Sequence, residues 1–221
     1  MAIKTIVITS GTTFVVPWDW NSSNNKIEAI GGGAGGNSNG GGGGAAYSRI
    51  DNFSATVGET IAISIGAGGG LNANGGSTTF GNSNQLVAVG GGRAPSSATR
   101  GPGGTAAASN GTVKFNGGNG GSSRGGGGGA AGPSGAGVNA TSVVTLLTHA
   151  NGGRGGNNAG GLGGTATANN QISAVTPVLT SENGKAGTDL TSNGILYSTG
   201  ATPVSAGSGG GGAGTFVSDV S

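Results

Sequence analysis

The sequence predicts an all-β or irregular fold without α-helices. In this fold a small N-terminal β-sandwich-like part is interleaved with packed polyglycine II helices, the left-handed type that polyproline also forms. Three observations support the prediction. Glycine accounts for 56 of the 221 residues, where roughly 7% is usual. Charged residues make up only 7%, whereas disordered chains are normally rich in charge. Short runs of β-branched residues end directly in glycine tracts.

Side-chain burial alone is too small a source of stability for the whole chain. Hydrophobic residues account for 33%, with only five Phe, two Trp, two Tyr and one Met. Burial contributes about 25 cal/mol per Å² of apolar surface, whereas ordering the backbone costs about 1–2 kcal/mol per residue and most for glycine. If the tracts are ordered, backbone hydrogen bonds must supply much of the stability.

The candidate strands are short runs of β-branched or alternating apolar residues. They cover residues 3–9, 13–16, 25–30, 47–66, 77–80, 85–90 and 112–115. The long run divides into two strands at Val57-Gly58, and residues 81–84 are expected to join the fifth and sixth runs in a hairpin.

The glycine tracts lie between these runs. They cover residues 31–44, 66–70, 90–92, 101–104, 117–137, 152–164 and 207–214. They have no strict period, which excludes the collagen repeat, and Ala, Asn and Ser fill them rather than Lys or Glu. A polyglycine II helix rises about 3.1 Å per residue without internal hydrogen bonds, so neighbouring helices would have to bond one another. The alternative is a β head that carries disordered glycine arms.

The chain divides by composition into three parts. Residues 1–30 form a β-strand segment suited to docking, residues 31–137 form a β/polyglycine II scaffold, and residues 138–221 combine glycine tracts with glycine-poor loops. The glycine-poor stretches 138–151 and 165–206 are rich in Thr, Ser, Asn and Val. Because the sequence begins within a few residues of the glycine-rich part, we expect no separate attachment domain.

Several classes of function find no support in the sequence. There is no Cys, and a single His disfavours a zinc site. No nucleophile elbow occurs, and no G-x-G-x-x-G match opens a helical pattern, so we expect no catalytic residues, no metal and no cofactor. The basic residues are scattered singly, and no apolar run reaches 18 residues. We therefore expect neither nucleic-acid binding nor membrane insertion.

An ordered series of motifs runs through the first two thirds of the chain. It consists of GTTFVVP (11–17), IEAIGGGAGG (27–36), GGGGGAAYSRI (40–50), VGETIAISIGAGGG (57–70), GGSTTFG (75–81) and GGGGGAAGPSGAG (125–137). This series resembles the glycine-rich domain proteins found among bacteriophage tail fibre and receptor-binding proteins. The resemblance implies a rigid slab of packed polyglycine helices whose loops at one end contact the host surface.

The resemblance also implies a function: a non-enzymatic virion protein, a tail fibre tip or adhesin, on the extracellular face of the virion tail. Its implied partners are other virion proteins and a host surface glycan or outer-membrane protein, and a homo-oligomer is compatible with it. Two alternatives stay open. One is a structural or decoration protein of a virion or cell surface without a receptor. The other is an ice-binding protein, although the irregular tracts lack a regular Thr or Ala spacing.

Six residues are candidates for receptor contact: Trp18, Trp20, Arg93, Arg100, His149 and Tyr197. The tryptophans are able to stack on a sugar, although one of them is also expected to cap the small β core. The arginines suit phosphate or carboxylate, or serve as solvated charges that keep a neutral surface soluble. The tyrosine lies in a hairpin-like stretch and offers a large contact area at low entropic cost. The histidine is expected to be a polar loop residue.

Overall fold

The computed structural model describes residues 4–37, 40–95, 99–122, 125–141, 166–167 and 180–181. These residues contain strands and no helix, which confirms the all-β prediction for this part of the chain. The strands are β1 (Thr13–Val15), β2 (Lys26–Ile30), β3 (Tyr47–Asp51), β4 (Thr60–Ser64), β5 (Thr78–Phe80), β6 (Leu86–Ala88), β7 (Val113–Phe115), β8 (Ala166–Thr167) and β9 (Thr180–Ser181).

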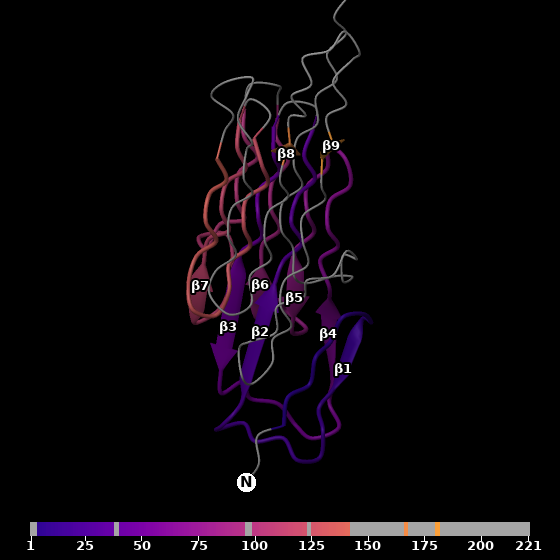
Figure 1. Ribbon diagram of the computed structural model, residues 1–221. Helices are drawn as coiled ribbons and strands as arrows, with labels where there is room; N and C mark the ends of the chain where they lie inside the picture. Colours follow the sequence, from indigo (N-terminus) through magenta and orange to yellow (C-terminus); the bar gives the residue numbers. More distant parts are fainter. Residues whose placement is uncertain are drawn as a thin grey trace, which may run out of the picture.

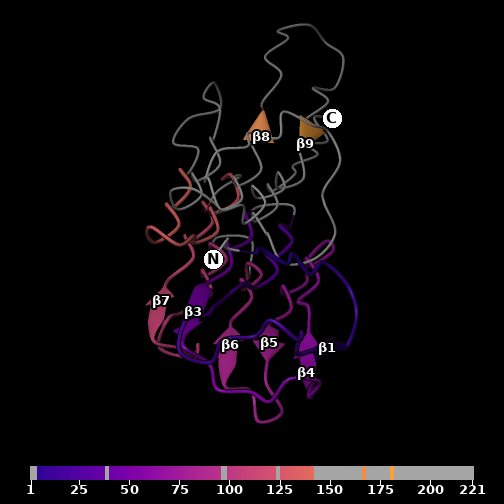
Figure 2. The same ribbon diagram turned by 90° about the horizontal axis from the view of Figure 1, so that it is seen from below.

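Seven of the strands form two antiparallel sheets. One sheet has four strands in the order β1-β4-β5-β6, and the other has three in the order β2-β3-β7. Strands β8 and β9 pair with each other, also antiparallel. In Figure 1 the strands β1 to β7 gather in the lower half of the molecule. The view from below in Figure 2 shows six of them in the row β7, β3, β6, β5, β4 and β1.

Most of the predicted strands occur where the sequence indicated them, and the hairpin formed by β5 and β6 is confirmed. The prediction for residues 3–9 is wrong, because residues 4–9, its described part, belong to no strand. Ile8 packs against the core, but Ile6 and Val7 are half exposed. Strand propensity reflects the fit of a side chain to a pleated, half-buried surface, and no described strand pairs with this run.

The two sheets share one apolar core, which side chains of both sheets fill. Ala29 of β2 packs among residues of β4, β5 and β6. The buried members of this core are Val16, Ala29, Ile61, Ile63, Phe80, Leu86 and Ala88. The rings of Phe53 and Phe80 meet edge to face at 5.3 Å, a favourable geometry for aromatic pairs. The sheets are therefore held together by conventional side-chain burial.

Glycine tracts connect these strands as hairpins. The tracts are residues 31–36, 40–46, 66–70, 73–76, 89–92, 101–104, 117–121, 125–131 and 137–141. The first leaves β2 and the second returns to β3, and pairs of tracts connect β4 to β5 and β6 to β7 in the same way. In Figure 1 the tracts run side by side upward from the strands.

The hydrogen bonds between tracts repeat at every third residue. The amides of Gly41 and Gly44 both donate to carbonyls of tract 117–121, at 2.9 Å each. Two residues is the repeat of a strand, whereas three residues is the repeat of a polyglycine II helix. None of the tract glycines is among the described glycines with positive φ, which are Gly11, Gly58, Gly81 and Gly111. The spacing of these bonds is therefore the spacing expected of the polyglycine II helices that the sequence predicts.

Tract 40–46 lies at the centre of the bundle. It exchanges backbone hydrogen bonds with five other tracts, namely 31–36, 89–92, 101–104, 117–121 and 125–131. All of its residues are buried. A Cβ added at Gly41 would lie 1.9 Å from the carbonyl oxygen of Gly126, closer than any real Cβ contact. This packing therefore requires glycine.

Candidate functional site

The tips of the tract hairpins lie together at the end of the molecule opposite the sheets of β1 to β7 (Figure 1). The described residues of these hairpin tips are 37, 40, 70–73, 93–95, 99–100, 121–122 and 125. The antiparallel pairing makes β2 parallel to β7 and β4 parallel to β6. The tracts that follow these four strands all extend toward this end (Figure 1).

Asparagine side chains connect neighbouring tips. The Asn37 Nδ2 donates to the carbonyl of Ala94 at 3.0 Å. Its Oδ1 accepts the amide of Gly40 at 2.8 Å, which closes its own turn. The side chain thus fixes one tip and ties it to the next.

A second set of amide contacts positions an arginine. The Asn74 Oδ1 accepts the backbone amide of Arg93 at 2.8 Å. The Arg93 guanidinium donates to Asn72 Oδ1 at 3.1 Å. Asn72 has a φ of 57°, which asparagine tolerates better than most residues. Arg93 is therefore held at the tips through its backbone by Asn74 and through its guanidinium by Asn72.

The described part of the tips is positively charged. Arg93 and Arg100 are both exposed. The described carboxylates all belong to the sheet end of the molecule: Asp19, Glu28, Asp51 and Glu59. Leu71, 80% exposed, adds an apolar group to the tips. A guanidinium presents a planar fork of donors that matches carboxylate and phosphate groups, so the tips are suited to binding anionic or hydroxyl-rich surfaces.

The structure does not bring the six predicted contact residues together. The two arginines lie at the tips, but Trp18 and Trp20 lie in the loop between β1 and β2, at the sheet end. Trp18 is 85% exposed. Trp20 is partly buried and caps the core, with its ring 6.1 Å from that of Phe14. His149 and Tyr197 lie outside the described residues.

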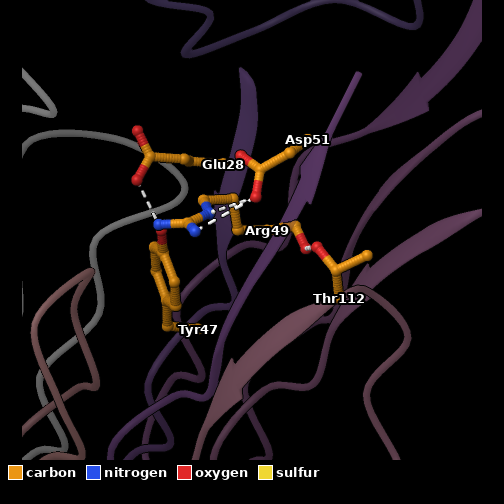
Figure 3. Close-up of polar contacts among 5 residues, drawn as sticks. All are labelled: Glu28, Tyr47, Arg49, Asp51 and Thr112. Carbon is orange, nitrogen blue, oxygen red and sulfur yellow. Dashed lines mark hydrogen bonds and ion pairs between the residues drawn. The ribbon is translucent and has the colours of Figure 1, made fainter. Parts of the chain in front are cut away.

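A polar cluster on the outer face of the three-stranded sheet was missed by sequence reasoning (Figure 3). Its members are Glu28, Tyr47, Arg49, Asp51 and Thr112. The Tyr47 hydroxyl donates to the Glu28 carboxylate. The Arg49 guanidinium donates to Asp51 Oδ2 at 3.1 and 3.2 Å, and the Thr112 hydroxyl donates to the Arg49 carbonyl at 2.9 Å. The sequence does show charged residues at alternate positions of β2 and β3. It does not show that Glu28 lies opposite Arg49, because this depends on the register in which the two strands pair.

The electrostatics of this cluster indicate a structural role. Burial raises the pKa of Tyr47 far above its ordinary value, and the bond to Glu28 raises it further. Burial lowers the pKa of Arg49, but the neighbouring Asp51 carboxylate outweighs this and the net pKa is raised. Both groups therefore keep their protons at neutral pH. The Tyr47 hydroxyl and the Arg49 guanidinium are each bonded to a carboxylate of the same sheet.

The described residues contain no group of three or more His, Cys, Asp or Glu side chains able to hold a metal ion. No helix long and apolar enough to cross a membrane occurs among them.

A family model described as a glycine-rich domain matches residues 8–221. No curated protein and no solved structure gave a match to the chain. The matched range contains every strand and every glycine tract of the described structure. The chain therefore belongs to the glycine-rich domain family.

Proposed function

We propose that this protein is a non-enzymatic bacteriophage virion protein, a tail fibre tip or adhesin, and that its hairpin tips bind a receptor on the host surface. One observation carries the proposal: the tips lie together at one end, expose two arginines and carry no described carboxylate, while the sheets lie at the other end. The resemblance to the glycine-rich proteins of phage tail fibres supports the same function.

The glycine bundle suits this role because it acts as a spacer. Six residues of a polyglycine II helix span roughly 19 Å, so the tips project well beyond the sheets. Each tract is bonded to its neighbours through the backbone. Tip side chains other than the bonding asparagines are then free to vary without loss of the packing between tracts.

The chemistry of the tips indicates the class of receptor. Arg93 and Arg100 favour phosphate or carboxylate groups, which they bind through paired hydrogen bonds. Such groups occur in anionic surface glycans of bacteria. We expect the interaction to weaken with salt, because exposed charges are screened over about 8 Å at physiological ionic strength.

The test is adsorption of the labelled protein to a panel of bacterial cells. The double variant Arg93→Gln/Arg100→Gln should bind receptor-bearing cells at least tenfold more weakly, with unchanged circular dichroism. Lys26→Gln is the matched control, because this exposed lysine lies on β2 at the sheet end and its neutralisation should leave adsorption unchanged. Equal binding by the double variant, or adsorption to none of the cells, would argue for a decoration protein instead.

A further inference from the structure

We propose that two copies of this chain associate through the edge strand β1, so that their four-stranded sheets join into one continuous antiparallel sheet about a two-fold axis. This inference concerns the sheet end and does not depend on the function proposed for the tips. It rests on the hydrogen-bonding edge of β1, on the apolar side chains beside that edge, and on the absence of charge along it.

The outer edge of β1 is open. On the inner side, the Thr12 carbonyl accepts the amide of Ile63 at 2.9 Å, and the Val16 amide donates to the backbone carbonyl of Glu59 at 2.9 Å. In an antiparallel ladder alternate residues bond the same neighbour, so the backbone groups of Thr13 and Val15 point away from β4. No described strand pairs with this side, and both views show β1 as the outermost strand on its side of the molecule (Figures 1 and 2).

Apolar side chains gather beside this edge. Five of the seven exposed large hydrophobic residues of the described chain belong to β1 or to the segments around it, and they are Ile6, Val7, Val15, Trp18 and Val57. Two contacts bring these segments together. Lys4 pairs with Asp19 at 3.4 Å, and the Gly58 amide donates to the Val16 carbonyl at 2.9 Å. Exposed apolar side chains that gather in one place mark an interaction surface.

The occupant that fits is a second copy of the same edge. Natural sheets usually protect an edge strand with charged residues, but residues 10–16, SGTTFVV, carry no charge. Two such strands can meet antiparallel around a two-fold axis without opposing like charges. The exposed face that continues from this edge is also uncharged, and its residues are Thr13, Val15, Thr60, Ala62 and Ser64. The outer face of the other sheet differs, because it carries Lys26, Glu28, Arg49 and Asp51.

Sedimentation velocity of the full chain from about 1 µM to about 100 µM, a range in which weak specific dimers are populated, tests the proposal. The wild type should reach about twice the chain mass of 20.3 kDa. Val15→Lys should raise the dissociation constant at least tenfold, because it puts a like charge on both strands of the shared edge. The side chain of Val15 is 59% exposed, so the variant should keep the circular dichroism of the wild type.

The matched control is Val138→Lys, at a 51% exposed position in tract 137–141, which should dimerise like the wild type. Thr13→Lys provides a second edge variant if Val15→Lys does not fold, and it should also shift the equilibrium to monomer. A wild type that stays monomeric, or forms trimers, would overturn the proposal. So would an edge variant that folds and dimerises as tightly as the wild type. A monomer that instead captures an extended segment of another protein would assign the edge to that partner.

Discussion

The sheets and the glycine bundle both exclude water, but they do so in opposite ways. In the sheets large side chains such as Leu86 and Ile61 fill the space between two layers. In the bundle the absence of side chains lets the backbones approach one another closely. A Cβ added at Gly43 would lie 1.9 Å from the carbonyl oxygen of Pro102, so there is no room for one. Large side chains therefore stabilise the sheets, whereas the bundle requires that side chains be absent.

The two kinds of packing meet at a buried side chain. The Thr78 hydroxyl donates to the carbonyl of Ile30 at 2.7 Å and accepts the amide of Gly66 at 3.0 Å. Ile30 is the last residue of β2, and Gly66 begins a tract. One hydroxyl thus satisfies backbone groups where the ladder of the sheet gives way to the bonds between tracts.

The largest effect is expected from adding a methyl group to the centre of the bundle. Gly41→Ala would place its Cβ 1.9 Å from the carbonyl oxygen of Gly126, and a backbone atom cannot move away as a flexible side chain can. We expect the free energy of unfolding to fall by about 4 kcal/mol or more, beyond the usual cost of overpacking. Urea denaturation followed by circular dichroism measures it. A variant as stable as the wild type would show that the tracts are not closely packed.

The next largest effect is expected from removing carbon atoms from the sheets. Leu86 is fully buried, and Leu86→Ala should lower the free energy of unfolding by about 3 kcal/mol through lost burial and the cavity left behind. The same denaturation assay applies. A loss below about 1 kcal/mol, the range of exposed positions, would mean that the sheets do not rely on this core.

A smaller, pH-dependent effect is expected at Tyr47. Tyr47→Phe removes the bond to Glu28 and should cost about 1–2 kcal/mol at pH 7. Because the pKa of Tyr47 is raised in the folded state, the unfolded chain loses its proton first. The stability contributed by the neutral phenol is complete below the unfolded pKa of about 10 and is lost as pH rises above it. Denaturation between neutral and alkaline pH should show the wild type losing stability relative to Tyr47→Phe. Parallel pH profiles would contradict this account.

The smallest effect is expected at the surface of the bundle. A Cβ added at Gly68 would meet only the carbonyl oxygen of Gly33, at 3.9 Å, which is ordinary contact. Gly68→Ala should therefore stabilise the protein slightly, by about 0.5 kcal/mol, because it restricts the unfolded chain. Gly68→Ala and Gly41→Ala make the same chemical change, so a difference in their stability reports the difference in packing around the two glycines. A large loss of stability in Gly68→Ala would contradict this account, because it would show that glycine is required where there is room for a Cβ.

The sequence predicted local structure better than it predicted pairing. The runs around Leu86 and Phe80 were identified because alternation and turn residues are local signals. The partners of β3 could not be predicted, because the chain between paired strands passes through glycine tracts that have no side-chain pattern. The prediction of a strand at residues 4–9 was wrong because these residues have the composition of a strand but no neighbouring strand in the described structure.

The candidate site was predictable only in part. Arg93 and Arg100 were identified from the loop between them, and both lie at the hairpin tips. The sequence could not show that Trp18 lies far from these arginines, because this depends on the end of the molecule at which each loop lies. The ties made by Asn37 and Asn72 also depend on tracts that are distant along the chain.

Hydrogen exchange of the tract amides tests the central claim most directly. The amides of Gly41, Gly43 and Gly44 donate to three neighbouring carbonyls at 2.9–3.0 Å. If backbone bonds between tracts hold the bundle together, these amides should exchange about 10³-fold or more slowly than in a free peptide, as stable core amides do. Exchange at the free-peptide rate would contradict the account.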